Sequence, residues 1–442
     1  MRYKRQIIVI TVMAALITLA QCSKSYNKTD NENGTMAQKA GSAKTKSLIE
    51  QGKQIFRFDN FGDTAFWSGV LHIDKAILGS NLGGFGPGVS PATALSVGLK
   101  VDVDALPPEV VQRIKSGTIN LNDPATTVAL LKLNAVVGVT GDFKPDGTLQ
   151  AVGITCASCH STVDNSFAFG IGKRLDTWPN RDLNVGGIIS LTDNALPLAN
   201  LLHVDEATLR RVLGLWGPGK FSAILFMDGK AFRPDGKVAA NTIPAAFGLK
   251  DINLVTYTGW GSISYWNSFV ANLEMHGKGN FSDPRLNDPV KYPIAVENGF
   301  YNVTNNPDLI TSKLPALREY QHSIDAPQPP AGSFDVAAAA RGKSIFLTKA
   351  QCASCHRLPI LADNVLHSAA ELGIDDFEAM RSPTGMYRTT PLGGLFTRAR
   401  GGFYHDGRFA TLDDVINHYN DHFLLNLTAS QKRDLEEYLK SL

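Results

Sequence analysis

Two copies of a Cys-x-x-Cys-His motif constrain this 442-residue chain more than any other feature. Both copies read Cys-Ala-Ser-Cys-His, at residues 156–160 and 352–356, and together they use four of the five cysteines. This motif is the attachment signal for c-type haem, in which two thiols bond to the porphyrin and the adjacent histidine ligates the iron. The sequence therefore predicts two covalently bound haems. The attachment sites are Cys156, Cys159, Cys352 and Cys355, and the proximal iron ligands are His160 and His356.

Cys-x-x-Cys also occurs in redox dithiols and in zinc sites. A thioredoxin-like pair does not need the histidine that follows both motifs, and a zinc site needs further cysteines or histidines at ligand spacing. Chance does not explain two copies with the same Ala-Ser interior. The haem interpretation is therefore favoured over these alternatives.

The N-terminus has the pattern of an export signal. Basic residues at positions 2, 4 and 5 precede an apolar run over residues 7–20, which is too short to span a bilayer stably. Residues 19–22, Leu-Ala-Gln-Cys, resemble a bacterial lipobox, in which Cys22 is lipidated and becomes the first residue of the mature protein. Gln21 departs from the small residue usual there, so a chance cysteine in an ordinary signal is the alternative.

Residues 23–46 are polar and predict a flexible tether between a lipid anchor and the folded body. Because c-type haem is attached outside the bacterial cytoplasm, we expect an exported protein at the periplasmic face of a membrane. Removing Arg2, Lys4 and Arg5 with the signal changes the formal charge from +2 to −1. The mature chain therefore has no basic footprint for nucleic acid.

An internal repeat organises the body of the chain. Residues 50–56, Glu-Gln-Gly-Lys-Gln-Ile-Phe, are nearly repeated by residues 340–346, Ala-Arg-Gly-Lys-Ser-Ile-Phe, ahead of the second motif. After each motif, an X-Pro pair leads to a Gly-rich stretch and then a helical segment at similar spacing. We predict a mainly α-helical protein with two tandem cytochrome c-like domains, at residues 47–325 and 326–442. An insertion at about residues 57–150 enlarges the first domain, and residues 325–332 form the expected linker.

The C-terminal region resembles a known family. Residues 387–392 (Tyr-Arg-Thr-Thr-Pro-Leu), 403–408 (Phe-Tyr-His-Asp-Gly-Arg) and 411–415 (Thr-Leu-Asp-Asp-Val) are similar to the C-terminal haem domain of bacterial dihaem cytochrome c peroxidases and MauG-type proteins. The N-terminal half matches only in its haem motif and the spaced repeat, and its insertion departs from the family pattern. The resemblance implies one iron with an openable position that meets peroxide, and a second haem that relays electrons.

The same resemblance suggests an axial ligand for the second haem. The family's ligand, methionine in the peroxidases and tyrosine in MauG, falls at or next to Tyr419. A tyrosine ligand favours ferric iron, whereas methionine raises the potential. Met386, His418, His422 or no sixth ligand are the alternatives, and His405 is expected to organise hydrogen bonds at the haem edge.

For the first haem, the repeat places Met275 or His276 near the sixth position. Adjacent residues face different directions from a helix, so only one of them can ligate, and a five-coordinate iron is the alternative. Peroxide cleavage also needs an acid/base group. Asp164, Asp228 and Glu274 lie in this half of the chain, but spacing singles out none of them.

Two functions follow from these patterns. The first is a peroxidase or MauG-like oxidase that relays electrons between two haems, with hydrogen peroxide as a substrate. The second is a non-catalytic dihaem electron-transfer cytochrome of a respiratory chain. Either function predicts a small redox protein or a quinol-linked donor as the electron source, and attachment to a membrane through the lipid at Cys22.

Overall fold

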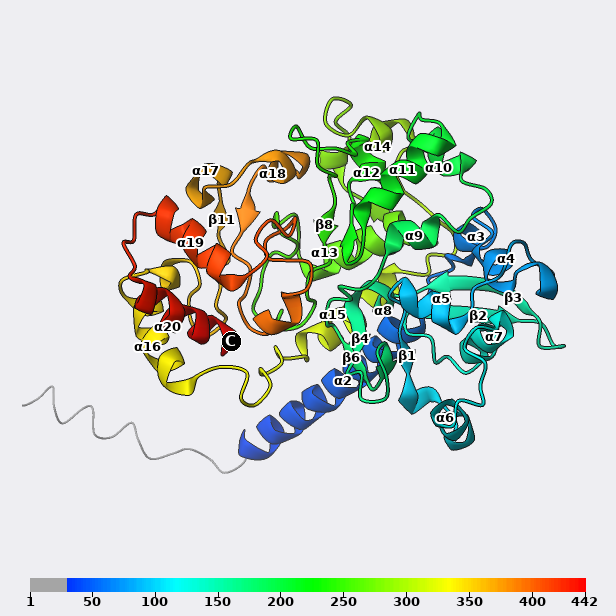
Figure 1. Ribbon diagram of the computed structural model, residues 1–442, viewed down its shortest axis with the longest axis horizontal. Helices are drawn as coiled ribbons and strands as arrows, with labels where there is room; N and C mark the ends of the chain where they lie inside the picture. Colours follow the sequence, from blue (N-terminus) through cyan, green and yellow to red (C-terminus); the bar gives the residue numbers. More distant parts are fainter. Residues whose placement is uncertain (1–29) are drawn as a thin grey trace, which may run out of the picture. The chain divides into compact units, whose positions relative to one another are not determined.

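The computed structural model describes residues 30–442, with side chains from residue 43 onward (Figure 1). The predicted signal, Cys22 and the first part of the predicted tether lie outside the described residues. Residues Ile49–Leu442 form one compact unit, which contains both Cys-x-x-Cys-His motifs, and the chain up to Leu48 is a separate unit. Among the described residues, no helix combines the length and apolar character needed to cross a membrane.

The described chain is mainly helical, as the sequence predicts, with small sheets between the helices. The α-helices are α2 (Asp30–Phe58), α3 (Thr64–Trp67), α4 (Ile73–Leu78), α5 (Pro91–Ser96), α6 (Pro108–Lys115), α7 (Pro124–Lys132), α8 (Ala157–His160), α9 (Val185–Ile189), α10 (Leu196–Leu201), α11 (Glu206–Trp216), α12 (Leu225–Asp228), α13 (Ile263–Phe269), α14 (Pro293–Glu297), α15 (Leu314–His322), α16 (Val336–Leu347), α17 (Ala369–Leu372), α18 (Phe377–Arg381), α19 (Leu412–His422) and α20 (Ala429–Lys440). The 3-10 turns are η1 (Ser80–Leu82), η2 (Val103–Ala105), η4 (Pro284–Leu286), η5 (Thr311–Lys313), η6 (Cys352–Ser354) and η7 (Leu395–Arg398), and η3 (Val270–Glu274) is a π-helical turn.

The strands of the described region pair two by two. They are β1 (Val101–Asp102), β2 (Val139–Phe143), β3 (Leu149–Ile154), β4 (Ser161–Val163), β5 (Ile171–Gly172), β6 (Arg174–Asp176), β7 (Lys220–Phe221), β8 (Asn241–Thr242), β9 (Phe281–Ser282), β10 (Asn302–Val303), β11 (Leu366–His367) and β12 (Tyr387–Arg388). The pairs are β1 with β5, β2 with β3, β4 with β6, β7 with β8, β9 with β10, and β11 with β12. Only the first pair is parallel among these sheets of the described residues.

Helix α2 corrects part of the predicted tether. Residues 30–46 were expected to be flexible, but they belong to a helix that continues through residues 50–56 to Phe58. The stretch contains no proline and includes three alanines and three lysines, which are good helix formers. Its polar composition therefore does not prevent it from extending the helix that begins the folded body.

Each of the two repeated Gly-Lys-x-Ile-Phe strings places its glycine where one helix crosses closely over another. In α2, a Cβ added to Gly52 would lie 2.0 Å from the carbonyl oxygen of Ala316 in α15. In α16, a Cβ added to Gly342 would lie 1.9 Å from the carbonyl oxygen of Asp434 in α20. Only a residue without a side chain allows two helices to approach this closely.

The aromatic contacts beside these glycines repeat as well. Phe56 meets Tyr320 edge to face, with ring centroids 5.5 Å apart, and Phe346 meets Tyr438 in the same way at 5.1 Å. Each tyrosine follows the residue at its crossing by four positions, which is one helical turn. The internal repeat therefore has a counterpart in helix packing, and the predicted linker at residues 325–332 lies between α15 and α16.

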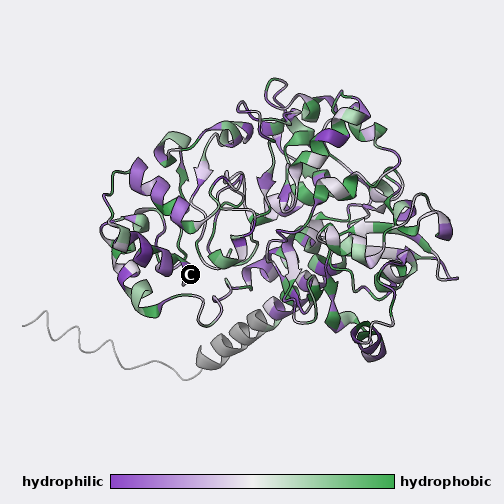
Figure 2. Ribbon diagram, in the orientation of Figure 1, coloured by the Kyte–Doolittle hydropathy of each residue, from purple (hydrophilic) through white to green (hydrophobic). Residues whose placement is uncertain are grey.

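The segment at residues 57–150, predicted as an insertion, belongs to the main hydrophobic core. Helices α3, α4 and α7 and strand β3 contribute side chains such as Trp67, Leu131 and Val152 to that core. The Nε1 of Trp67 donates to the carbonyl oxygen of Met275, at 3.2 Å. By contrast, α6 has no buried residue and is mainly hydrophilic (Figure 2). The segment therefore packs against the first motif's surroundings, with α6 as its solvated edge.

Candidate functional site

The first motif places its histidine at the end of the short helix α8. The Nδ1 of His160 donates to the carbonyl oxygen of Pro244, at 3.1 Å, which leaves Nε2 available for a metal. Burial lowers the pKa of His160 to about 4, so the imidazole is neutral at physiological pH. A neutral ring held through its other nitrogen by a carbonyl is the usual state of an iron-ligating histidine.

The second motif has the same arrangement with a different carbonyl. The Nδ1 of His356 donates to the carbonyl oxygen of Leu361, at 3.0 Å, and burial lowers the pKa of this histidine as well. The carbonyl comes from five residues along the chain, whereas that for His160 comes from 84 residues along. Both histidines are therefore oriented to ligate iron, but the two sites are not built identically.

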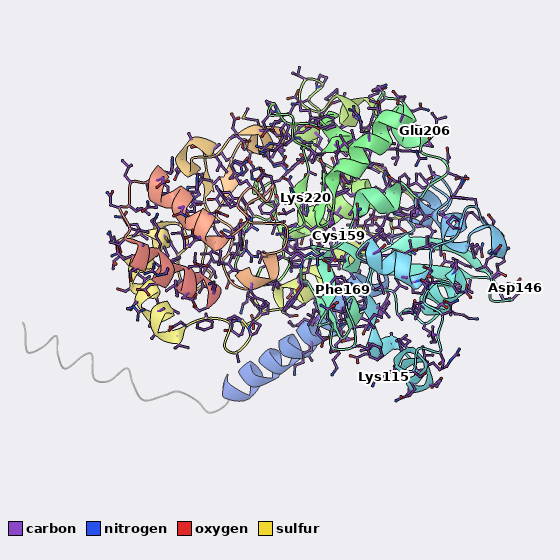
Figure 3. All side chains as sticks on the ribbon, in the orientation of Figure 1. Lys115, Asp146, Cys159, Phe169, Glu206 and Lys220 are labelled. Carbon is purple, nitrogen blue, oxygen red and sulfur yellow. The ribbon has the colours of Figure 1, made fainter. Side chains whose placement is uncertain are left out.

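The four cysteines of the motifs are free thiols. Burial raises the pKa of Cys156, Cys159 and Cys352 to about 12, so these thiols are protonated at neutral pH. Redox dithiols depend on the opposite shift, because the thiolate is the reactive form. The local environment therefore disfavours a dithiol redox centre. Figure 3 labels Cys159 near the middle of the view, with Lys115 and Asp146 toward its edge.

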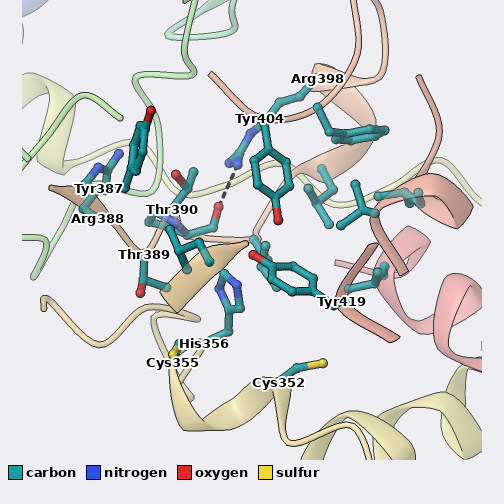
Figure 4. Close-up of a pocket in the computed structure, with 18 of the residues that line it drawn as sticks. Cys352, Cys355, His356, Tyr387, Arg388, Thr389, Thr390, Arg398, Tyr404 and Tyr419 are labelled. Atoms are coloured by element: carbon teal, nitrogen blue, oxygen red, sulfur yellow. Dashed lines mark hydrogen bonds between the residues drawn. The ribbon is translucent and has the colours of Figure 1, made fainter. Parts of the chain in front are cut away.

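A cavity of about 460 Å³ lies over the second motif (Figure 4). It is lined by both attachment cysteines and by His356 and Tyr419. Its apolar wall comes from α16, α19, α20 and the loops that join them, through Phe346, Leu412, Val415, Ile416, Leu427, Leu435 and Leu439. Two thiols, one oriented imidazole and an apolar wall are the groups that a covalent haem needs, so the residues present fit this cofactor.

The candidates for the sixth position of the second haem separate clearly. Tyr419 lines the cavity, whereas Met386 is 40% exposed and is not among the lining residues. His418 and His422 donate through Nε2 to backbone carbonyls of α17, at 2.9 Å and 3.0 Å. Of the predicted candidates, only Tyr419 shares the cavity with His356.

A second tyrosine accompanies Tyr419. Figure 4 shows the hydroxyl groups of Tyr404 and Tyr419 turned toward each other. Burial, together with hydrogen bonding between these side chains, raises the pKa of Tyr404, and the same hydrogen bonding opposes the rise at Tyr419. Burial raises the pKa of Tyr419 to about 12. His405 also lines the cavity, where it stacks on Tyr387 with ring centroids 5.0 Å apart, and its buried Nε2 has no partner.

We expect Tyr419→Phe to change the ferric spectrum of one haem and to leave the other unchanged. Loss of an anionic ligand that favours ferric iron should also raise that haem's midpoint potential, by about 59 mV for each tenfold change in the ferric-to-ferrous ratio. Visible absorption and spectroelectrochemical titration measure both effects. Tyr438→Phe is the matched control, because Tyr438 packs against Phe346 outside the cavity lining. Equal spectra for the two variants would exclude Tyr419 as a ligand.

Near the first motif, the two predicted ligand candidates have different neighbours. Met275 is buried in the cluster that contains Ala157, and Cys156 packs against the same cluster. His276 has a positive φ of 60° and stacks on Phe66, with ring centroids 3.6 Å apart. Met275 is therefore the one whose packing brings it beside the motif.

Glu274 stands out from the three predicted acid/base candidates. It ends the π-helical turn η3, and both of its carboxyl oxygens are buried without a hydrogen-bond partner. Burial raises its pKa well above the usual value, and its charge contributes to the raised pKa of Cys159. Asp228 is instead ion-paired with Arg381, and Asp164 caps an exposed turn. π-helical turns often occur at functional sites.

A small metal site is an alternative use of one motif cysteine. Cys355, Asp363 and His367 each offer a ligand atom, all within 4.8 Å of one another. However, His367 already binds Asp363 through Nε2, at 3.0 Å, and Glu371 through Nδ1, at 2.7 Å. A haem attached at Cys355 would also consume its thiol, so the haem and metal interpretations exclude each other.

Several functional candidates were not predictable from spacing. Pro244 is the proline of the X-Pro pair that follows the first motif. Nothing in that pattern predicts that its carbonyl oxygen accepts from His160. The cavity over the second motif is also lined by three arginines, Arg181, Arg388 and Arg398. Arg388 stands in the stretch that resembles the peroxidase family, but no sequence pattern distinguishes Arg181. These residues become functional candidates only through contacts with residues far apart in the chain.

The chain matches no family model and no curated protein sequence. Among solved structures, it is similar to the hydrazine synthase of Kuenenia stuttgartiensis pressurised with xenon, at 18% identity over 46% of this chain and 72% of that chain, with a TM-score of 0.28. It is also similar to a MauG-like protein associated with microbial copper homeostasis, at 17% identity over 48% of this chain and 76% of that chain, with a TM-score of 0.31. Similarity at this level carries no conclusion about function.

Proposed function

We propose that this chain is an exported dihaem c-type cytochrome that acts as a peroxidase or MauG-like oxidase. The observation that carries this proposal is Glu274, a buried carboxyl group without a partner beside the first haem motif. A protein that only transfers electrons has no need for such a group, and burying one without a hydrogen bond is costly. Buried acids with raised pKa values are typical of general acid/base catalysis.

The reaction reduces hydrogen peroxide with two electrons and two protons to give two molecules of water. The two haems, once bound, supply the iron that carries the electrons. His160 and His356 would hold the irons through Nε2, since Nδ1 of each is engaged by a carbonyl. The carboxyl group of Glu274, which keeps its proton because burial raises its pKa, would donate that proton to the outer peroxide oxygen and take up the proton of the other oxygen. Protonation makes the outer oxygen a better leaving group.

The second haem is the proposed relay. A tyrosine ligand at Tyr419 would bias its iron toward the ferric state, and the apolar cavity wall would keep water away. A small redox protein or a quinol-linked donor is the proposed source of electrons. The predicted lipid at Cys22 would hold the protein at the periplasmic face of a membrane.

A non-catalytic electron carrier is the second candidate function. It is favoured by Met275, because a buried thioether packed beside the first motif is able to close the sixth position of its iron. A six-coordinate first haem would exclude peroxide, and Glu274 would then only tune the potential of that haem. The two functions therefore differ in the coordination of one iron.

Low-temperature electron paramagnetic resonance of the fully oxidised protein, and again after one-electron reduction, tests the proposal. We expect a high-spin ferric signal in at least one of the two states, because peroxide needs an open iron. Two low-spin haems in both states would instead support the electron carrier. Peroxide-dependent oxidation of a reduced cytochrome, compared with a His160→Ala variant, separates enzymatic turnover from the background reactivity of haem.

A further inference from the structure

Three arginines line the cavity over the second motif, of which Arg181 is buried and Arg388 and Arg398 are partly buried. Arg181 comes from the segment after the first motif, Arg388 from β12, and Arg398 from η7. No aspartate or glutamate is among the described residues that line this cavity. The ion pairs formed by the described side chains also include none of the three guanidinium groups. Three positive charges are therefore gathered in an apolar cavity without an acidic partner.

Backbone carbonyls hold two of these guanidinium groups in place. Arg398 donates through Nη1 to Pro391, at 2.7 Å, and through Nη2 to Gly393, at 2.8 Å, while its Nε is buried without a partner. Arg388 donates through Nε to the carbonyl of Thr256, while its Nη1 is buried without a partner. Figure 4 shows both side chains at the cavity.

Arg181 is held more loosely. Its Nη1 lies 3.4 Å from the carbonyl oxygen of Arg400 and 3.5 Å from that of Gly402, and its Nε is buried without a partner. Each of the three arginines thus retains one unused, buried N–H donor. Unsatisfied buried donors are uncommon in folded proteins and suggest a ligand that completes them.

The charges of these arginines are also poorly compensated. Burial, together with the neighbouring guanidinium groups, lowers the pKa of Arg388 and of Arg398 to about 10. Both side chains are still protonated at neutral pH. The phenol of Tyr257 opposes this shift at all three arginines, so a single phenol faces three cations. An anionic ligand would relieve both the charge and the unused donors.

We propose that Arg181, Arg388 and Arg398 bind the two propionate carboxylates of the haem attached at Cys352 and Cys355. This inference rests on the proposed haem at the second motif. Guanidinium groups form short, charge-assisted and often bidentate hydrogen bonds with carboxylates. Two carboxylates beside three guanidinium groups would leave one net positive charge near the iron.

The position of Arg181 bears on how the second haem would be oriented. The backbone N–H of its neighbour Asn180 donates to the carbonyl oxygen of Cys159, at 2.8 Å, so this arginine belongs to the loop that supports the first motif. If Arg181 binds a propionate, the propionate edge of the second haem faces the first motif. The first haem domain then completes the binding site of the second haem.

The midpoint potential of the second haem tests this assignment in the intact, haem-loaded protein. A nearby cation stabilises the ferrous state, so loss of one should lower the potential. We expect Arg181→Gln and Arg388→Gln each to raise the ferric-to-ferrous ratio at a fixed potential about tenfold, a shift of about 59 mV. A variant without Cys156 and Cys159, which carries only the second haem, identifies the couple concerned.

Two further variants make the result decisive. Arg388→Lys keeps the charge and should retain most of the wild-type potential, even if the bidentate geometry is lost. Arg400→Gln is the matched control, because Arg400 is exposed, pairs with Asp182 and does not line the cavity. Potentials for Arg181→Gln and Arg388→Gln that match the control, with haem content unchanged, would overturn the assignment.

A free anion is the other ligand that three arginines could bind, and a titration separates the two. Inorganic phosphate or succinate added to the haem-loaded protein should leave the second haem's absorption and potential unchanged, because the propionates already occupy the arginines. A saturable shift that Arg388→Gln abolishes would overturn the assignment and identify an anion site. Neither readout depends on peroxide turnover, so the failure of the peroxidase proposal would be recognised separately.

Discussion

Glu274→Gln should reduce peroxide turnover by about 10²–10⁴-fold, which is the usual contribution of a positioned acid/base group. Glutamine has nearly the same size as a protonated glutamate and is also uncharged, so the variant should fold normally. It cannot pass a proton from one peroxide oxygen to the other. Steady-state oxidation of a reduced cytochrome by hydrogen peroxide measures the loss, and absorption spectra check that both haems are present.

Asp164→Asn is the matched control for this prediction. Asp164 belongs to the same half of the chain, but it accepts hydrogen bonds from Ser166 and Lys173 in an exposed turn. Its loss should leave turnover close to that of the wild type. A Glu274→Gln variant that turns over peroxide as fast as Asp164→Asn would remove the main support for the enzymatic function.

The pH dependence of turnover gives an independent check on Glu274. Burial raises its pKa well above 4.5, so the carboxyl group keeps its proton at pH values where an exposed glutamate is ionised. Turnover that needs the protonated acid should be highest below this raised pKa and should fall as pH rises through it. The Glu274→Gln variant should lack that decline. An alkaline decline of equal size in both proteins would assign it to another group.

Arg381→Met should lower the free energy of unfolding by about 3–5 kcal/mol, the usual cost of removing one partner from a buried ion pair. The Arg381 side chain is 1% exposed and binds both carboxyl oxygens of Asp228, at 2.8 Å and 3.1 Å. It also binds Glu378, at 3.1 Å. The change leaves two buried carboxylates without their cation, and denaturant unfolding of matched haem-loaded proteins measures the effect.

Two controls test this explanation. Arg318→Met removes an exposed arginine that pairs with its neighbour Glu319, and exposed pairs contribute little to stability. Adding Asp228→Asn and Glu378→Gln to Arg381→Met should recover much of the lost stability, because the uncompensated charges are then gone. The loss should also shrink at acidic pH, because burial raises the pKa of Glu378 and favours its protonation there. If the Arg381→Met variant were as stable as Arg318→Met, the buried ion pair would not contribute the expected stability.

The covalent chemistry of the candidate site could be predicted from local sequence. Cys-x-x-Cys-His would supply both attachment thiols and the proximal ligand within five residues, so their prediction needs no knowledge of the fold. The repeated strings around Gly52 and Gly342 were equally informative, because a close helix crossing requires glycine at one fixed position. The helical character of the body followed from similar local patterns.

The groups that face each motif could not be predicted in this way. The carbonyl that orients His160 belongs to Pro244. Arg181, which follows the first motif in the chain, lines the cavity over the second motif. Glu274 could not be distinguished from Asp164 and Asp228, because all three are ordinary acidic residues in the sequence. Burial and missing partners separate them, and both depend on the packing of distant segments.

The sequence by itself predicted two haem attachment sites, the histidines expected to ligate their irons and a helical body, since short motifs and local periodicity indicate these features. The tertiary structure decided that Tyr419 shares a cavity with His356 while Met386 does not, and that both carboxyl oxygens of Glu274 are buried without a partner. It also brought three arginines together from both halves of the chain. Solvent exclusion and charge proximity arise only when distant segments pack together, so local sequence patterns do not reveal them.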